Sequence, residues 1–259
     1  MKVEVLLSCM NKKEFSIIDK SNLSMVNTLI INQCDKEGYL FIDEKHRVIN
    51  TKTRGLSVSR NLALHNTDAD ICLLCDDDEC FVNDLEKKII NAYHSIPEAD
   101  LIIFKITDRV DKFGGMKKKL SKLELMRVSS VQISFRVSSV VGKVDFDQLL
   151  GAGTPNGSGE ENKFLLDCYS KKMKIYYVPV GIATVEQQES TWFCGYNDNY
   201  FYKRGSMTRY VYGFPFAVLY AMYFSLTKKK IYGADSTMWE AFSYILKGII
   251  DNNVGKQKK

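Results

Sequence analysis

The residues of this chain best suited to chemistry form a run of carboxylates directly after an apolar segment. Residues 73–79 read LLCDDDE and place Asp76, Asp77 and Asp78 next to one another. Like charges about 4 Å apart repel by roughly 1 to 4 kcal/mol in water or near a protein surface, so a cation is expected to offset them. Mg²⁺ or Mn²⁺ takes one or two carboxylates together with phosphate oxygens. The run therefore predicts a metal site that holds a nucleotide diphosphate. The alternative is an acidic turn that only caps a helix.

Two arginines lie upstream of this run, in the segment RGLSVSRN. Arg54 and Arg60 carry planar guanidinium groups, which donate several hydrogen bonds at once to phosphate or base oxygens. The segment therefore predicts contacts with a nucleotide. Arginines on the surface of a helix are the alternative interpretation.

A second group of carboxylates begins a predicted helix much later in the chain. The glycine-rich loop 146–159 runs into Glu160 and Glu161. A carboxylate within reach of an acceptor hydroxyl can take its proton as a general base. Acidic residues also stabilise helix N-termini without any catalytic role, so that interpretation stays open.

The elements that must position these residues alternate between strands and helices. The expected strands are 3–9, 27–33, 70–75, 99–106 and 174–180, and the expected helices are 57–65, 84–95 and 160–171. Such alternation favours an α/β fold with a largely parallel sheet. Ligands of these sheets bind beyond the carboxyl ends of the strands, where Ser8, Asp35 and the aspartates are expected to emerge. The charged segment 108–122 predicts an exposed turn or hairpin, and 132–141 predicts an extended stretch.

The composition favours a folded protein of a reducing cytoplasm. Hydrophobic residues make up 45% of the 259 residues, enough for a sizeable core. The apolar run at the N-terminus is too short for the h-region of a signal peptide. Seven cysteines lie in apolar runs without zinc-ligand spacing, which predicts free, buried thiols.

The C-terminal part differs in character from the rest. Residues 211–226, a stretch of sixteen, carry no charge, and Lys228, Lys229 and Lys230 follow. This length falls short of the roughly 20 residues that a spanning helix needs, which favours an interfacial segment slightly over a buried helix pair. The lysines would be attracted to anionic lipid headgroups, although a solvated face is the simpler interpretation of each lysine cluster. Nucleic acid is not an expected partner, because no binding module accompanies the net charge of +5.

Taken in order and at these separations, five segments resemble a known family. LLSCMN, LIINQCD, TRGLSVSRNLAL, ADICLLCDDDECF and GSGEENKFLLDC are similar to segments of the inverting glycosyltransferases of family two, above all bacterial enzymes that assemble capsular or exopolysaccharide glycans. The resemblance covers roughly residues 2–180. It implies a GT-A fold, with a mostly parallel central sheet flanked by helices, in a domain of residues 1–205. Residues 206–259 would form a helical, hydrophobic C-terminal extension.

The resemblance also implies roles for single residues at the donor. The nucleotide-sugar-binding residues would be Ser8, Cys9, Asp35, Arg54, Arg60, Asp76 and Asp77. Asp35 would contact a uracil-type base, and Arg60 would support the nucleotide. The acidic run matches the DxD region of the family, with Cys75 where the first Asp often stands. Asp77 is therefore the leading ligand of Mn²⁺ or Mg²⁺, followed closely by Asp78 and Asp76.

The expected base and acceptor residues come later in the chain. Glu161 matches the acid of the family's Glu-Asp pair and becomes the predicted base, with Glu160 as a rival because Glu replaces the commoner Asp. Trp192 and Tyr196 are the predicted acceptor-binding residues. The chain lacks the Gln-x-x-Arg-Trp signature of processive synthases, which favours transfer of one sugar per encounter.

These features together predict a metal-dependent enzyme that transfers a sugar from a nucleotide-diphosphate donor, a UDP-sugar, to a hydroxyl of a glycan. The acceptor is expected to be lipid-linked and to be met by peripheral contact at the inner membrane face. A sugar nucleotidyltransferase is an alternative, but the segment after the first strand lacks the glycines of its phosphate loop. An inactive nucleotide-sugar-binding module is another. A metal hydrolase is least favoured, because all three histidines lie outside the acidic motifs.

Overall fold

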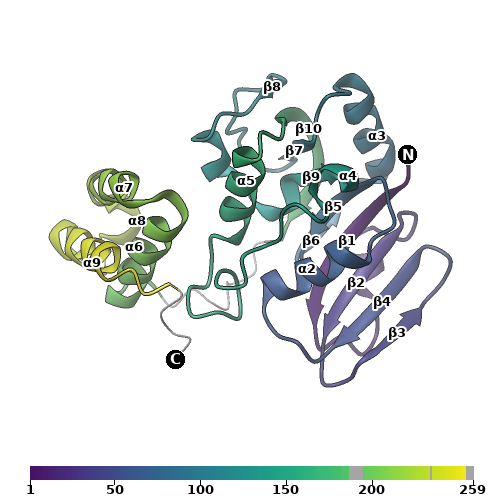
Figure 1. Ribbon diagram of the computed structural model, residues 1–259, viewed down its shortest axis with the longest axis horizontal. Coiled ribbons are helices and arrows are strands. Elements are labelled where there is room, and N and C mark those ends of the chain that lie inside the picture. The colour runs from purple at the N-terminus through teal and green to yellow at the C-terminus, as the bar shows by residue number, and fades with distance from the viewer. Residues whose placement is uncertain (187–194, 234, 255–259) are drawn as a thin grey trace. The chain divides into compact units, whose positions relative to one another are not determined.

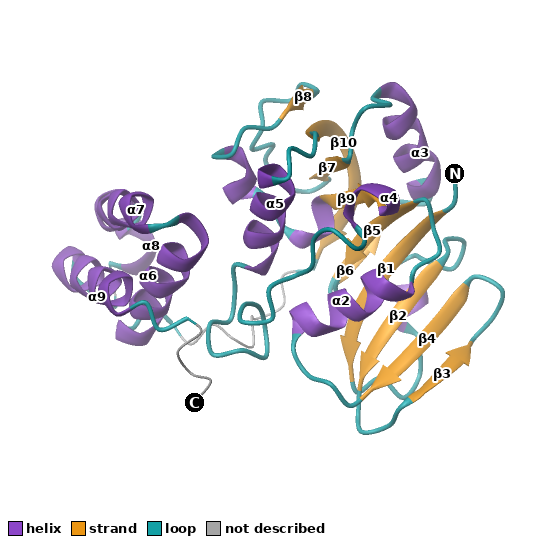
Figure 2. Ribbon diagram, viewed as in Figure 1, coloured by secondary structure: helices purple, strands orange, loops and turns teal. Residues whose placement is uncertain are grey.

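The computed structural model describes residues 1–186, 195–233 and 235–254, which form two compact units. The first, here called the sheet unit, comprises Met1–Asp147 and Glu161–Gln188. The second, the helical unit, comprises Gln148–Glu160 and Glu189–Lys259. Figure 1 labels the elements of both units, and Figure 2 separates helices from strands.

The sheet unit is built on one mixed sheet. Its strands are β1 (Val3–Met10), β2 (Thr28–Gln33), β3 (Gly38–Phe41), β4 (His46–Thr51), β5 (Ile71–Cys75), β6 (Glu79–Phe81), β7 (Leu101–Ile106), β8 (Lys118–Lys119), β9 (Ile133–Arg136) and β10 (Ile175–Val185). In the described residues their order is β3-β4-β2-β1-β5-β9-β7-β10-β6, and β8 pairs with β10. The neighbours β4, β2, β1 and β5 are parallel, whereas β9 runs antiparallel to both β5 and β7.

Helices flank this sheet (Figure 2). They are α1 (Ile17–Lys20), α2 (Leu56–Asn66), α3 (Leu85–Ser95), α4 (Val137–Val140) and α5 (Glu160–Ser170), with short 3₁₀ turns at Glu124–Arg127 and Ser130–Gln132. Strands β1, β2 and β5 are buried along almost their whole length, as parallel strands covered on both faces should be. Their near-continuous apolar sequences follow from that burial.

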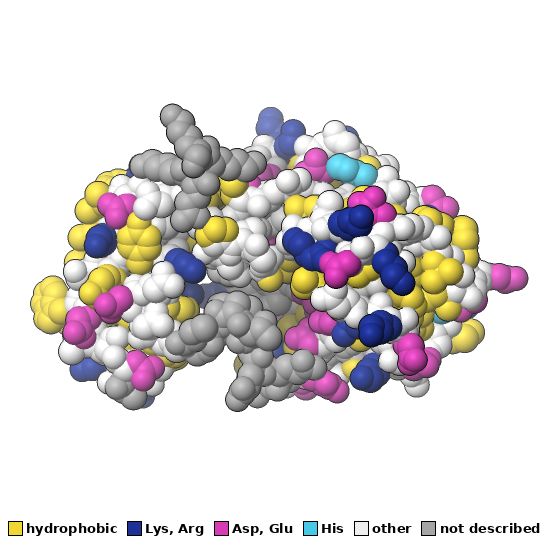
Figure 3. All heavy atoms as spheres, turned by 90° about the horizontal axis from the view of Figure 1, so that it is seen from below, with side chains coloured by type: hydrophobic (Ala, Val, Ile, Leu, Met, Phe, Trp, Pro, Cys, Tyr) yellow, Lys and Arg dark blue, Asp and Glu magenta, His cyan; other side chains and the backbone are white. Residues whose placement is uncertain are grey.

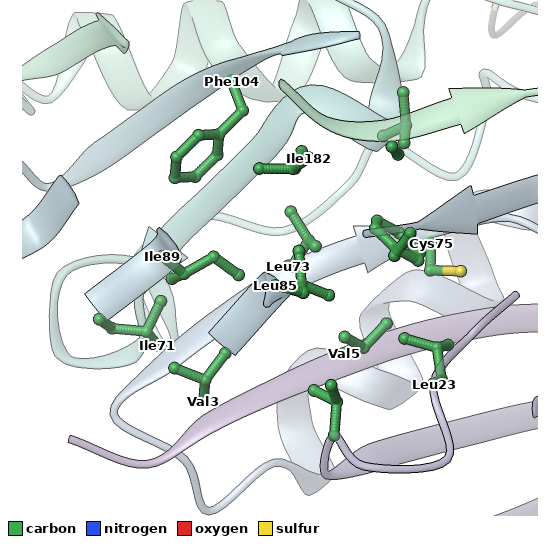
Figure 4. Packing of buried hydrophobic residues seen from close by; sticks show 14 of the residues in the cluster. Val3, Val5, Leu23, Ile71, Leu73, Cys75, Leu85, Ile89, Phe104 and Ile182 are labelled. Carbon is green, nitrogen blue, oxygen red and sulfur yellow. The ribbon is translucent and has the colours of Figure 1, made fainter. Parts of the chain in front are cut away.

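Alternation along β5 assigns its side chains to the two faces of the sheet. Ile71, Leu73 and Cys75 point to one face and pack in a buried cluster with Leu85 and Ile89 of α3 (Figure 4). Each of these side chains is at most 1% exposed. The cluster fixes the end of β5, and with it the start of the acidic run.

The helical unit contains α6 (Asp198–Tyr212), α7 (Phe214–Thr227), α8 (Lys229–Tyr232) and α9 (Met238–Asp251). Helices α6 and α9 pack closely because glycines lie at their contact. A Cβ on Gly205 would lie 2.0 Å from the carbonyl oxygen of Ile245, and one on Gly248 would lie 2.0 Å from that of Tyr202. Aromatic side chains fill the centre of the unit, with Phe201 and Tyr232 fully buried.

The predicted α/β architecture with a helical C-terminal region is confirmed, and three details differ from expectation. Residues 132–141 were expected to be extended, but only Ile133–Arg136 forms a strand and the helical turn α4 follows it. The hairpin of β3 and β4 was not predicted, because β3 is exposed along its whole length and its residues do not alternate between polar and apolar. The last strand continues to Val185 and pairs with β6, which was also unexpected.

The uncharged segment 211–226 lies largely in α7, and the six cysteines of the described residues are free. Within the described part of the chain, no helix has the length and apolar character needed to cross a lipid bilayer.

Candidate active site

The carboxyl ends of β1, β2, β4 and β5 lie at one edge of the sheet, because these strands are parallel neighbours. Figure 3 looks toward this edge, where Lys and Arg side chains lie among Asp and Glu side chains on the sheet unit. Most of the sequence-predicted donor residues are in the segments that follow these strands.

Arg60 is the centre of this group of charges. It lies on α2 and is 1% exposed. Its Nη2 donates to both carboxylate oxygens of Asp76, at 3.1 and 3.0 Å, and its Nη1 lies 3.7 Å from Oε1 of Glu161. Ser130 completes the contacts of Asp76 by donating its hydroxyl to Oδ2 at 2.8 Å. One buried guanidinium thus joins the first aspartate of the acidic run to the predicted base.

The packing around Arg60 explains how α2 and α5 come together. Asn61, the next residue on α2, forms two hydrogen bonds with the backbone of Phe146, at 2.8 and 2.7 Å. The ring of Phe146 stacks on Phe164 of α5 with centroids 4.2 Å apart and lies beneath the Arg60 guanidinium at 5.4 Å. These contacts hold the helix that carries Glu161 against the helix that carries Arg60.

The two glutamates at the start of α5 differ in their surroundings. Glu161 is 21% exposed and belongs to the sheet unit with Arg60. Glu160 is only 3% exposed and belongs to the helical unit. Glu161 is therefore the more accessible of the two carboxylates.

Asp77 has a different cationic partner. Its Oδ2 lies 3.0 Å from Nζ of Lys12, in the segment after β1. The side chain of Asn32 on β2 holds the backbone of Lys12 from both sides, by accepting from its N–H at 3.0 Å and donating to its carbonyl at 2.9 Å. The segment after β1 is therefore fixed in a position that brings Lys12 to the acidic run.

Burial raises the pKa of Asp78, and the neighbouring carboxylates of Asp76 and Asp77 raise it further. Arg109 acts in the opposite direction and lowers it. The pKa of Glu79 also lies well above its usual range, because the side chain is buried and faces Asp76. Its carboxylate accepts the backbone N–H of Asp76 at 3.2 Å, which closes the turn.

Asp35 and Arg54 meet at the outer side of the site. Nη2 of Arg54 donates to Oδ1 of Asp35 at 2.7 Å, and Nη1 donates to the carbonyl of Lys52 at 2.8 Å. Asp35 is 96% exposed in this pair. Gly55, with φ of 110°, a value that favours glycine, turns the chain from Arg54 into α2.

Ser8 and Cys9 lie on β1 and are mostly buried. The hydroxyl of Ser8 accepts from that of Ser59 on α2 at 2.8 Å. Burial raises the pKa of the Cys9 thiol to about 12, and the charge of Asp77 adds to the effect. Both side chains thus lie buried beneath the acidic run, and we call Ser8 and Cys9 the floor of the site.

The predicted acceptor residues belong to the C-terminal part of the chain. Trp192 is outside the described residues. Tyr196 belongs to the helical unit, where its ring meets that of Tyr200 edge-on at 5.1 Å.

Three residues of this arrangement were not anticipated from the sequence. Lys12 follows the first predicted strand, and Asn32 lies in the second. Ser130 lies in a segment without a recognisable pattern. The only signal for Lys12 was its place after the first strand, at the edge where ligands bind in parallel sheets.

The contacts of the three aspartates determine which of them could hold the predicted divalent cation. Both oxygens of Asp76 are already engaged by Arg60, and Asp77 pairs with Lys12. Burial raises the pKa of Asp78, the charges of Asp76 and Asp77 raise it further, and a cation would offset those charges. Among the described residues no cluster of three His, Cys, Asp or Glu side chains has the arrangement of a metal site. A cation here would need further oxygens, such as those of a diphosphate.

The sequence matches no protein-family model and no curated protein. Its structure is similar to that of S. aureus TarS. For residues 1–349 of TarS in complex with UDP-GlcNAc, the TM-score is 0.62 at 13% identity, with 97% of this chain and 89% of TarS 1–349 covered. For the same fragment in complex with UDP, the TM-score is 0.59 at 13% identity, with 96% of this chain and 81% of the fragment covered.

The crystal structure of TarS itself gives a TM-score of 0.55 at 14% identity and covers 100% of this chain and 44% of TarS. At such low identity the likeness concerns the fold. The GT-A type of fold that the sequence predicted is thereby confirmed.

Proposed function

We propose that this chain is an inverting glycosyltransferase that moves a sugar from a nucleotide-diphosphate donor, a UDP-sugar, to a hydroxyl of a glycan acceptor. The observation that carries the proposal is the contact of one buried arginine, Arg60, with both Asp76 and Glu161. Asp76 begins the acidic run that could bind a metal-bound diphosphate, and Glu161 is a carboxylate that could act as the base. Arg60 contacts both. The proposal is further supported by the fold shared with TarS, whose structures hold UDP-GlcNAc and UDP.

The chemistry follows from these positions. The carboxylate of Glu161 accepts the proton of the acceptor hydroxyl, while that oxygen forms a bond to the anomeric carbon of the donor. The bond from this carbon to the diphosphate breaks, and the nucleoside diphosphate leaves from the opposite face, so the configuration inverts. Arg60 holds the Glu161 carboxylate in place and offsets the negative charge around it.

Asp78 and Asp77 would hold Mn²⁺ or Mg²⁺, and the contacts around them favour Asp78. When bound, the cation offsets the charge that develops on the departing diphosphate. Lys12 and Arg109, which face Asp77 and Asp78, provide positive charge on the same side of the acidic run.

Glu161→Gln tests the base directly. We expect a fall in kcat of roughly 100- to 10,000-fold, because the amide cannot accept the proton, with the affinity for UDP retained. Turnover would be followed as release of UDP, and affinity by equilibrium titration. Asp167→Asn is the matched control, because Asp167 lies on the same helix and forms an ion pair with Lys163. Equal rates in both variants would move the base elsewhere.

Asp78→Asn tests the metal assignment. It should raise the Mn²⁺ concentration needed for half-maximal turnover by about tenfold or more, since a neutral amide binds hard cations weakly. Asp84→Asn, at the start of α3, is the control and should leave the metal dependence unchanged. Asp77→Asn, tested beside it, separates the two predicted ligands. A variant of Asp78 with the same metal dependence as the native chain would refute its role.

The product identifies the reaction class. Transfer to a glycan releases UDP, whereas a sugar nucleotidyltransferase releases or consumes pyrophosphate. An inactive binding module would bind UDP and release nothing with any acceptor. An assay that measures both UDP and pyrophosphate therefore separates these three functions.

We further propose that the acceptor is met at a membrane surface, in the synthesis of a surface polysaccharide. The membrane contact is argued from one face of α7. Leu219, Met222, Tyr223 and Leu226 follow the i, i+3, i+4, i+7 spacing of a single helix face and are between 48% and 65% exposed. Three lysines, 228–230, follow directly. Figure 3 shows hydrophobic side chains on the surface of the helical unit. Such a face suits the interfacial region of an anionic bilayer, where a lipid-linked acceptor would be met.

Vesicle sedimentation tests this placement. The chain should bind vesicles that contain phosphatidylglycerol more strongly than vesicles of phosphatidylcholine alone. Leu219→Glu should reduce binding, whereas Leu123→Glu in the sheet unit, at a leucine that is 64% exposed, should not. Equal effects of the two substitutions would count against contact through α7.

A further inference from the structure

The helical unit contains a cavity that the proposed reaction does not yet use. Its volume is about 310 Å³, at the lower end of the range typical of small-molecule sites. One wall is the loop 154–158, and the other is α6 with the residues that precede it. The two walls touch closely at Gly159, where an added Cβ would lie 2.9 Å from the side chain of Met207.

The charge of the cavity is positive. Lys203 and Arg204 line it, and no Asp or Glu is among the described residues that do. Asn156 and Asn199 also line it and offer amide groups that can both donate and accept hydrogen bonds. This lining suits a hydroxylated ligand that carries a negative charge.

Arg204 is held in place by neutral groups. Its Nε donates to the hydroxyl of Tyr220 at 2.6 Å and its Nη1 to that of Tyr200 at 3.0 Å. The guanidinium carbon lies 4.7 Å from the ring centroid of Phe224. Within the described part of the chain, no carboxylate forms an ion pair with it. Aromatic faces and hydroxyls orient a cation without neutralising it, so Arg204 keeps its full charge beside the cavity.

The position of the cavity along the chain connects it to the predicted base. Ser158 lines the cavity and precedes Glu161 by three residues. Three residues of fully extended chain span at most about 11 Å. Tyr200, which also lines the cavity, packs against Tyr196, a predicted acceptor residue. Both relations favour the acceptor over the donor as the ligand.

We propose that this cavity binds an oxyanion of the acceptor, a phosphate or a carboxylate, through Arg204 and Lys203. The assignment of the ligand to the acceptor rests on the proposed glycosyltransferase function. The site selects acceptors that carry an acidic group, and neutral glycans bind it weakly.

The experiment measures equilibrium binding of three small probes to the full chain by calorimetry or ligand-observed NMR. Glucose 6-phosphate represents a phosphate, glucuronic acid a carboxylate, and glucose the neutral comparison. At least one charged probe should bind about tenfold more tightly than glucose, the factor expected when a hydrogen bond to a charged group is added. The probe that binds more tightly identifies the oxyanion. Binding of glucose as tight as that of both charged probes would overturn the proposal.

Variants of α6 assign the binding to this cavity. Lys203→Gln and Arg204→Gln should each weaken binding of the charged probe by about threefold to tenfold, and Arg204→Lys should retain part of it. Arg209→Gln is the matched control, because Arg209 is on the same helix, packs on Phe214 and does not line the cavity. If the loss of Arg204 unfolds the helical unit, Lys203→Gln still tests the proposal. Native affinity in Lys203→Gln and Arg204→Lys, or an equal loss in Arg209→Gln, would overturn the proposal.

Titration with UDP separates this inference from the proposed function. The Lys203 and Arg204 variants should bind UDP like the native chain. A native chain that binds UDP but neither charged probe would refute the oxyanion site alone. A native chain that binds a charged probe through Lys203 and Arg204 but not UDP would refute the proposed function and leave an oxyanion site.

Discussion

Replacing Arg60 by methionine removes a buried guanidinium and keeps a side chain of moderate length beside Phe146. The carboxylate of Asp76 then loses two hydrogen bonds, of 3.1 and 3.0 Å, and Glu161 loses its cation at 3.7 Å. The substitution should therefore destabilise the sheet unit, because it leaves two carboxylates with less compensation.

The magnitude follows from the exposure of the partners. Removing one member of a buried ion pair costs about 3 to 5 kcal/mol. Asp76 is 26% exposed and Glu161 is 21% exposed, so water restores part of the loss. We therefore expect the free energy of unfolding of the sheet unit to fall by about 2 to 4 kcal/mol. A double-mutant cycle with Asp76→Asn should give a coupling energy of about 1 to 3 kcal/mol.

Hydrogen exchange is the appropriate assay, because a chain of two units need not unfold in one transition. Amides of β1 and β5, in the centre of the sheet, report on the sheet unit. Arg54→Met is the matched control, because Arg54 pairs with Asp35 at 2.7 Å on the surface. Exposed pairs contribute about 0 to 1 kcal/mol. Equal loss in both arginine variants, or additive effects of Arg60→Met and Asp76→Asn, would refute the central role of Arg60.

Two further predictions concern the floor of the site and the helical unit. Burial raises the pKa of Cys9 to about 12, so the rate of its alkylation by iodoacetamide should still rise about tenfold per pH unit between pH 9 and 10. The rate should also stay below that of the partly exposed Cys34. Peptide mass spectrometry measures both rates, and a plateau for Cys9 near pH 9 would contradict the prediction. Gly205→Ala should destabilise the helical unit by about 2 kcal/mol or more, because its Cβ would overlap the carbonyl of Ile245. Exchange of α9 amides measures this loss, and Ser243→Ala, on the exposed surface of α9, should change it by less than about 0.5 kcal/mol.

The strands that carry the site could be predicted because their burial leaves a clear mark in the sequence. β1, β2 and β5 are covered on both faces, so they appear as continuous apolar runs followed by polar residues. The hairpin of β3 and β4 could not be predicted in this way. β3 is exposed along its whole length at the edge of the sheet, and exposure removes the alternation that marks a half-buried strand.

The residue types of the site were also predictable, but their partners were not. Sequence and family resemblance selected Arg60, Asp76 and Glu161 separately, and each had an ordinary alternative interpretation. Their contact depends on Asn61 and Phe146, which hold α2 and α5 together. Such packing between distant segments leaves no periodic pattern in the sequence.

The acidic run shows how three adjacent aspartates acquire different roles. Consecutive residues in a turn point in different directions, so each carboxylate meets a different surrounding. Asp76 meets buried Arg60, Asp77 meets half-exposed Lys12, and Asp78 is half-buried with Arg109 as its opposing cation. The first two are offset by direct ion pairs, whereas burial and the other two carboxylates raise the pKa of Asp78. A divalent cation would therefore gain most from Asp78, and it would reach this residue without displacing either ion pair. If Asp77 were the main ligand instead, Lys12→Gln would free it and strengthen Mn²⁺ binding, whereas a metal held by Asp78 predicts little change.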